Sequence, residues 1–187
     1  MKFIFNRALR ILLVANWLLC IASAMLGPIY ALFVKNIGGD ILDSCCASAL
    51  FFITAGLTTL ISGSYSDKLK DNTFIIVLGY TIVGIGFLGY TMVTSVFSLL
   101  IVQVITGLGE AIYVPVFDAV YSKHVDRHQA GLQWGASEAI GYFTWALGAL
   151  FGGFLITFFG FNAMFIVMAC LCFASALYVV QVPRTVL

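Results

Sequence analysis

Three carboxylic acids lie inside long apolar stretches of this 187-residue chain, at Glu110, Asp118 and Glu138. An ionisable side chain in a membrane-spanning helix costs about 2.5–3.5 kcal/mol by insertion scales, so such groups usually face a cavity or a partner. Counted from Tyr121, where the apolar run ends, Glu110 lies about 16 Å deep, near the middle of a hydrocarbon core about 30 Å thick. Asp118 lies about 5 Å deep, and Glu138 about 12 Å along the next apolar run.

Polar neighbours share the helical face of Glu110. Gln103 and Thr106 stand seven and four positions before it, which aligns the three side chains in a stripe on an otherwise apolar helix. We hypothesise that Glu110 is a coupling site that binds a proton or a cation on a solute pathway. The alternative is a structural role, in which a protonated Glu110 is hydrogen-bonded to a neighbouring helix.

Two further apolar runs carry a polar or aromatic face. Glu138, Tyr142 and Trp145 follow the spacing i, i+4 and i+7, which places them along one side of a helix. The first apolar run has a similar face, of which the predicted pathway residues are Asn16, Ser23 and Tyr30. These faces could contact a solute. Hydrogen bonding between helices explains the face of the first run equally well, and close packing explains the glycines beside the face of Glu138, but not Glu138 itself.

The composition indicates a protein whose solvent is a bilayer. Hydrophobic residues make up 62% of the chain, charged residues only 9%, and the mean hydropathy is +1.08. A net charge of +1 gives no basic field for nucleic acid. The five cysteines lack metal-ligand spacing, no constellation suggests an enzyme, and no cofactor is expected. The G-x-G-x-x-G at 84–89 follows no strand, so it predicts a packing face rather than a dinucleotide site.

The fold class predicted from hydropathy is an all-α membrane protein forming a single six-helix bundle over residues 1–187. A spanning helix needs about 20 apolar residues, and the predicted spans are 8–34, 42–63, 74–94, 96–121, 131–157 and 161–182. Of the nine basic residues, only Lys35 falls on the outer side if both termini are cytoplasmic, which is the orientation that the charge bias predicts. The charge-free spans 74–94 and 161–182 are expected to be lipid-facing supports.

A cluster of charges interrupts the apolar pattern at GSYSDKLKDN, residues 63–72. Charges in a cytoplasmic turn anchor the ends of two helices, which is an ordinary explanation for this cluster. The spacing of Gly63, Asp67 and Lys68 also resembles the loop between helices 2 and 3 of the major facilitator superfamily of secondary transporters. Other matching segments are Gly27–Tyr30, Thr106–Gly109 with Pro115, and the glycines of span 131–157. The resemblance extends over the whole chain but covers only the N-terminal six-helix half of that family's fold. Gln103 stands where the family often has an arginine.

The resemblance implies two inverted three-helix repeats and secondary active transport of a small solute by alternating access, coupled to a proton or another cation. Six helices supply one of the two bundles that this mechanism needs, so the expected assembly is a homodimer in the plasma membrane. Within that assembly Gly63, Asp67, Lys68 and Asp118 are expected to form a gating loop, with Asp118 paired to Lys68. A fragment of a twelve-helix transporter and a non-transporting membrane subunit are the alternatives. The residues are compatible with a sugar, an amphiphilic cation, a peptide or a metabolite anion as the solute.

Overall fold

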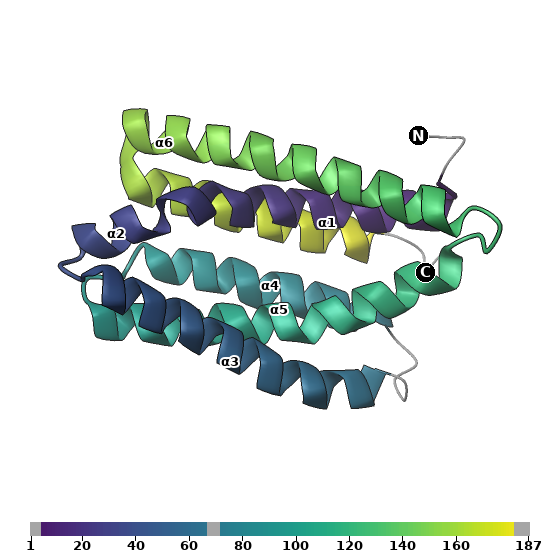
Figure 1. Cartoon of the computed structure of the whole chain (residues 1–187), viewed down its shortest axis with the longest axis horizontal. Helices are drawn as coiled ribbons and strands as arrows, with labels where there is room; N and C mark the ends of the chain where they lie inside the picture. Colours follow the sequence, from purple (N-terminus) through teal and green to yellow (C-terminus); the bar gives the residue numbers. More distant parts are fainter. Residues whose placement is uncertain (1–4, 67–71, 182–187) are drawn as a thin grey trace.

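The computed structural model describes residues 5–66 and 72–181. This part of the chain is helical throughout, as Figure 1 shows, and its elements follow one another without any strand among them. In order they are α1 (Arg7–Leu26), the 3₁₀ turn η1 (Gly27–Ile29), α2 (Tyr30–Asn36), α3 (Ile41–Ser66), α4 (Asn72–Tyr90), α5 (Val96–His124) and α6 (Ala130–Val180).

The first predicted span is interrupted near its outer end. The Asn6 side chain caps α1 by accepting a hydrogen bond from the N–H of Leu9 at 2.8 Å. Pro28 has no N–H to continue the α-helical pattern, and the chain passes through η1 before α2 resumes. The interruption brings Tyr30 to the first position of α2, at the edge of the cavity described below.

The last two predicted spans form a single 51-residue element, α6. Gly160, with φ 79° and ψ 176°, is non-helical inside it, and the ribbon reverses there into two antiparallel arms (Figure 1). By length and composition, the described residues therefore contain five helical segments that could cross a membrane, where the sequence predicts six. These segments are Arg7–Asn36, Ile41–Gly63, Asn72–Tyr90, Val96–His124 and Ala130–Val180.

Several helix ends differ by a few residues from the approximate spans predicted from hydropathy. The span predicted to end at 94 ends at Tyr90, because the N–H groups of Thr91, Met92 and Val93 bond back over three residues and tighten the chain into a turn. Ser95 then caps α5 through a capping box with Ser98. The C-terminal ends of α3 and α5 lie beyond the predicted apolar spans, at Ser66 and His124, because polar side chains do not by themselves end a helix.

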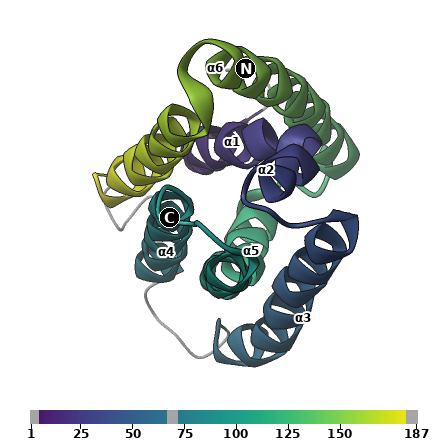
Figure 2. The ribbon, with the colours of Figure 1, turned by 90° about the vertical axis from the view of Figure 1, so that its left-hand side faces the viewer.

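Close contacts between small residues hold the helices together. Seen from the end in Figure 2, α1 lies beside both arms of α6, while α5 lies between α3 and α4. Gly148 and Gly152 of α6 meet the backbone of α1 at Ile21 and Met25. The glycines at 84–89 also pack closely, against Phe173, Thr106 and Val102, so the predicted packing face is confirmed.

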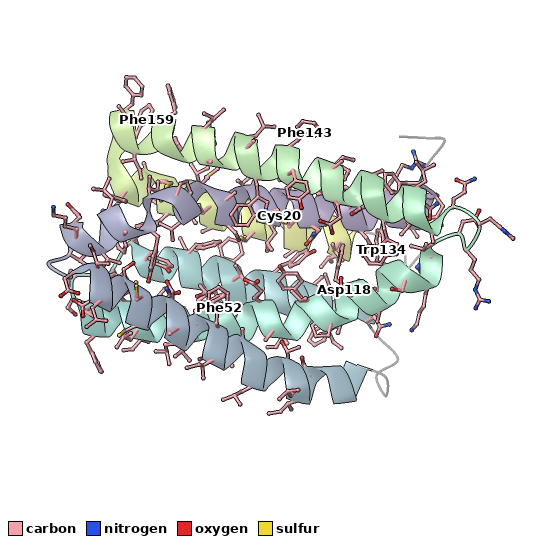
Figure 3. All side chains as sticks on the ribbon, viewed as in Figure 1. Cys20, Phe52, Asp118, Trp134, Phe143 and Phe159 are labelled. Carbon is pink, nitrogen blue, oxygen red and sulfur yellow. The ribbon has the colours of Figure 1, made fainter. Side chains whose placement is uncertain are left out.

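The helices expose many apolar residues, and they differ in how much of their apolar length is buried. In α3 only 11% of the apolar window is buried, against 44–50% in the other candidate spans. The first arm of α6 is also exposed, and Phe143 and Phe159 point outward from it in Figure 3. By contrast α4 and the second arm of α6 bury Tyr80, Phe165 and Met168 while they expose apolar residues such as Ile85 and Leu177, so these charge-free segments also supply part of the core. A lack of charge does not distinguish a lipid-facing side from an apolar interface.

Candidate functional site

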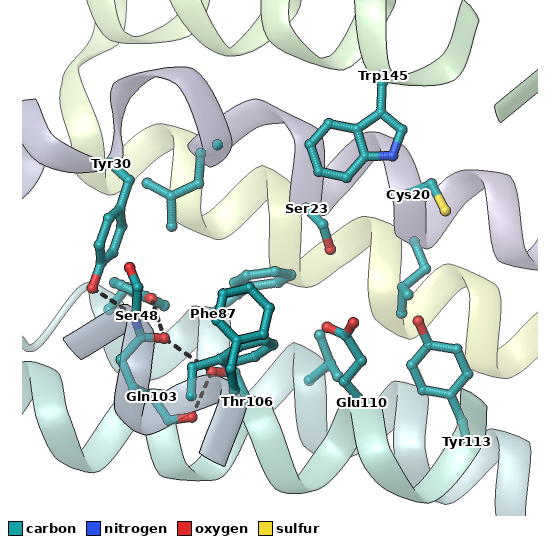
Figure 4. Close-up of a pocket in the computed structure, with 17 residues that line it drawn as sticks. Cys20, Ser23, Tyr30, Ser48, Phe87, Gln103, Thr106, Glu110, Tyr113 and Trp145 are labelled. Atoms are coloured by element: carbon teal, nitrogen blue, oxygen red, sulfur yellow. Dashed lines mark hydrogen bonds between the residues drawn. The ribbon is translucent and has the colours of Figure 1, made fainter. Parts of the chain in front are cut away.

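A cavity of about 520 Å³ lies among all the helices of the bundle, within the size range of small-molecule sites. Figure 4 shows it between α1 and α5, with the Trp145 ring over one side. The lining residues are Leu19, Cys20, Ser23, Leu26, Gly27, Tyr30, Ser48, Phe51, Phe52, Val83, Phe87, Tyr90, Gln103, Thr106, Glu110, Tyr113 and Trp145.

Glu110 is the carboxyl group of this cavity. It lies midway along α5, between Val96 and His124, and in Figure 4 its carboxylate is directed away from α5 into the space below Ser23. Within the described part of the chain, no side chain forms a hydrogen bond or an ion pair with this carboxylate. The hydrogen bond to a neighbouring helix that the structural alternative requires is therefore not present among the described residues.

Gln103 lies at the opposite end of the cavity and bridges three helices. Its Nε2 donates to the Tyr30 hydroxyl of α2, and its Oε1 accepts from the Tyr90 hydroxyl of α4 at 3.2 Å. The hydroxyl of Thr106 donates to the carbonyl oxygens of Val102 and Gln103, at 3.0 and 3.1 Å. These polar groups are already engaged with the protein, so they fix the first turn of α2 against α4 and α5.

The structure brings six of the predicted pathway residues to the cavity and leaves three outside it. Those that line it are Gln103, Thr106, Glu110, Ser23, Tyr30 and Trp145. Glu138 and Tyr142 are exposed, Tyr142 to 74%, and Asn16 is half-buried outside the lining. The reason is position along the helices, because Glu138 lies about 10 Å before Trp145 on α6, toward the end where α5 and α6 are joined. One helical face extends along the whole span, whereas the cavity occupies only part of that length.

The predicted gating loop is only partly within the described residues. Asp67 and Lys68 lie outside them, so the predicted pair between Asp118 and Lys68 lies outside them too. Gly63 belongs to the last turns of α3, where the neighbouring Ser62 hydroxyl donates to the carbonyl oxygen of Ala111 at 2.7 Å. Asp118 is exposed on α5.

Sequence reasoning missed the aromatic character of the cavity. Besides Tyr30 and Trp145, five rings line it: Phe51, Phe52, Phe87, Tyr90 and Tyr113. Ser48 of α3 was missed as well. The chain has seventeen Phe and eight Tyr, and nothing in their spacing separates the rings that line a cavity from those that face lipid.

The described residues contain no group of three or more His, Cys, Asp and Glu side chains that could hold a metal. Long apolar helices around a solute-sized cavity with a mid-depth carboxyl are typical of a multi-pass integral membrane protein.

Comparison with known proteins identifies the family. The model of the Major Facilitator Superfamily matches residues 12–186, and the chain belongs to this family of membrane transporters. The chain is 24% identical over 170 residues to "Multidrug resistance protein MdtG" of Erwinia billingiae, and 27% identical over 165 residues to "Uncharacterized MFS-type transporter YitZ" of Bacillus subtilis. It is also 24% identical over 140 residues to "Uncharacterized MFS-type transporter MJ1560" of Methanocaldococcus jannaschii. The resemblance predicted from the sequence is thus confirmed.

The matched regions differ in their share of each relative. They include 89% of this chain but 41% of MdtG, and 75% of this chain but 36% of MJ1560. In YitZ the match includes 86% of this chain and 97% of the relative. The chain therefore spans less than half the length of two of these relatives and nearly the whole length of the third.

Proposed function

We propose that this protein carries a small solute across the membrane by alternating access, in exchange or in company with a proton or another cation that binds Glu110. The observation that supports this most is a mid-depth carboxyl without a protein partner among the described residues, directed into a cavity of about 520 Å³. Gln103, Thr106, Ser23, Tyr30 and Trp145 complete the pathway at the level of the cavity. Asn16, Glu138 and Tyr142 lie farther along the same route, toward the end where α5 and α6 are joined.

In this proposal the bundle crosses the membrane six times, in two inverted three-helix repeats. The break at Gly160 supports two crossings by α6, because its arms are antiparallel and each is about long enough to span. An even number of crossings places both termini on one side. The distribution of basic residues favours the cytoplasm for that side. The plasma membrane is the location that we propose for the protein.

A second bundle closes the cavity on the side of α3 and the first arm of α6. Support comes from the exposed apolar residues of these segments and from Gly56 and Gly153, beside which a methyl group would meet nothing within 4 Å. We propose that the second bundle is another copy of this chain, since YitZ has a similar length. The alternative is six further helices of a twelve-helix transporter, which the lengths of MdtG and MJ1560 favour. In either assembly Gly63, Asp67, Lys68 and Asp118 form the cytoplasmic gate.

Reconstitution into liposomes tests transport and coupling together. The purified protein is placed in liposomes that contain a pH-sensitive dye, and a panel of sugars, amino acids, amines and organic anions is added outside. At least one solute should move protons through the wild-type protein, and Glu110→Gln should remove that signal. Asp126→Asn is the matched control, because Asp126 is exposed in the loop before α6 and asparagine keeps the acceptor for the His128 N–H. Proton movement that is unchanged in Glu110→Gln would refute the coupling role.

A further inference from the structure

The charge balance of the cavity is one-sided. Among the described residues that line it, Glu110 is the only one with a carboxylate, and none is a lysine, an arginine or a histidine. Position 103, two helical turns from Glu110 on the same face of α5, holds a neutral glutamine. A bound anion would therefore meet a negative group without a compensating positive one, and that unfavourable contact would be strengthened by the low local dielectric.

The polar groups at the Gln103 end of the cavity are largely engaged with the protein. The Gln103 amide is bonded to Tyr30 and Tyr90, and the Thr106 hydroxyl is bonded to backbone carbonyls. A polyhydroxylated group placed at that end would lose its water and find few free partners. These observations disfavour a polyhydroxylated group beside Gln103 and an anion beside Glu110.

Aromatic rings from several helices line the cavity. Phe87 of α4, Tyr113 of α5 and Trp145 of α6 lie around the space at Glu110 in Figure 4, and Phe52 of α3 also belongs to the lining. The face of an aromatic ring attracts a cation, and tryptophan does so most strongly. The carboxylate would bind a positive charge, and the rings would contact an apolar body. The lining therefore fits a solute that carries a positive charge on an apolar body.

We propose that this cavity binds an organic cation with an aromatic or bulky apolar body, whose charge lies at Glu110 and whose body contacts the rings. The inference deepens the proposed transport function, on which its biological meaning rests, but it concerns equilibrium binding alone. The neutral glutamine at position 103 leaves the charge of Glu110 without a compensating positive side chain among the described lining residues.

Two probe ions of the same shape and opposite charge test this proposal. Equilibrium binding of tetraphenylphosphonium and of tetraphenylborate is measured on the wild-type protein in lipid nanodiscs, with binding to protein-free nanodiscs subtracted. Tetraphenylphosphonium should bind saturably, and tetraphenylborate should not. Saturable binding of both ions, or of neither, would overturn the proposed charge selectivity.

Variants locate the charge that selects the cation. Glu110→Gln should weaken tetraphenylphosphonium binding at least tenfold, whereas Asp126→Asn should leave it unchanged. Gln103→Lys should weaken it more than Gln103→Met, because both variants lose the amide but only lysine adds a positive charge. Each variant is first shown to elute as the wild-type does on size exclusion. An equal affinity in Glu110→Gln and wild-type, or in the two Gln103 variants, would contradict the proposal.

The outcomes for binding and for transport are separable. If a sugar or an anion drives Glu110-dependent proton movement in liposomes while tetraphenylphosphonium does not bind, the transport function stands and the cation inference fails. If tetraphenylphosphonium binds in a Glu110-dependent manner and no solute of the panel moves protons, the cation site stands and coupled transport fails.

Discussion

Gly152 of α6 offers a quantitative test of how closely α6 packs on α1. A methyl group at Gly152 would lie 2.7 Å from the Cα of Met25 and closer still to its carbonyl oxygen. These are backbone atoms, so relief requires the two helices to separate rather than a side chain to turn. Gly153, the next residue, has nothing within 4 Å of the same position. The two glycines therefore form a matched pair in one turn of one helix.

The two glycine-to-alanine substitutions are expected to change stability in opposite directions. Overpacking an interface costs about 1–3 kcal/mol, and alanine regains roughly 0.5–1 kcal/mol of helix propensity over glycine. Gly152→Ala should therefore lose about 1–2 kcal/mol of stability, while Gly153→Ala should be neutral or slightly stabilising. Thermal unfolding in mild detergent, monitored by size exclusion, measures the difference in unfolding midpoint between the two variants. Equal midpoints, or a less stable Gly153→Ala, would refute the packing of α6 on α1.

Two further predictions concern single groups. Tyr90→Phe removes the hydroxyl that donates to the buried Gln103 Oε1 and should cost about 1–3 kcal/mol of unfolding free energy. Tyr80→Phe is the control, because it removes a buried hydroxyl without a hydrogen-bond partner among the described residues and should be neutral or stabilising. An equal loss of stability in both variants would contradict the Gln103 network. Gly160→Ala should cost about 1–3 kcal/mol, because φ 79° with ψ 176° is a conformation that essentially only glycine adopts, and an unchanged melting temperature would show that the chain turns elsewhere.

The positions of the helices could largely be predicted from the sequence. Apolar length and the short polar connections determine where a chain must leave a bilayer, and the break at Gly27–Ile29 followed from Pro28. The exact ends could not be predicted, because caps and tight turns such as Tyr90–Val93 depend on hydrogen bonds that hydropathy does not describe. The sequence predicts separate helices at 131–157 and 161–182, and the chain does reverse between them, at Gly160. The structure nevertheless has one element, α6, where two were predicted, because helical hydrogen bonding continues close to Gly160 on both sides.

The polar part of the cavity was more predictable than its aromatic part. Glu110, Gln103 and Thr106 stood out because polar residues are rare in an apolar helix, and their common face on α5 located them together. Glu138 followed the same logic but lies beyond the cavity, since a helical face specifies direction and not depth. Phe87, like the other rings of the lining, was not predictable, because aromatic residues are equally suited to lipid and to a cavity wall.

Access to Cys20 from the two sides of the membrane tests the central claim most directly. Cys20 is the cysteine that lines the cavity, and the other four, Cys45, Cys46, Cys170 and Cys172, can be replaced by alanine. A membrane-impermeant maleimide is added to one side or the other of liposomes that hold the protein and a trapped dye. The account predicts that Cys20 is labelled from both sides while the dye stays inside, as a cavity opening alternately requires. Labelling from one side only, or from neither, would contradict it.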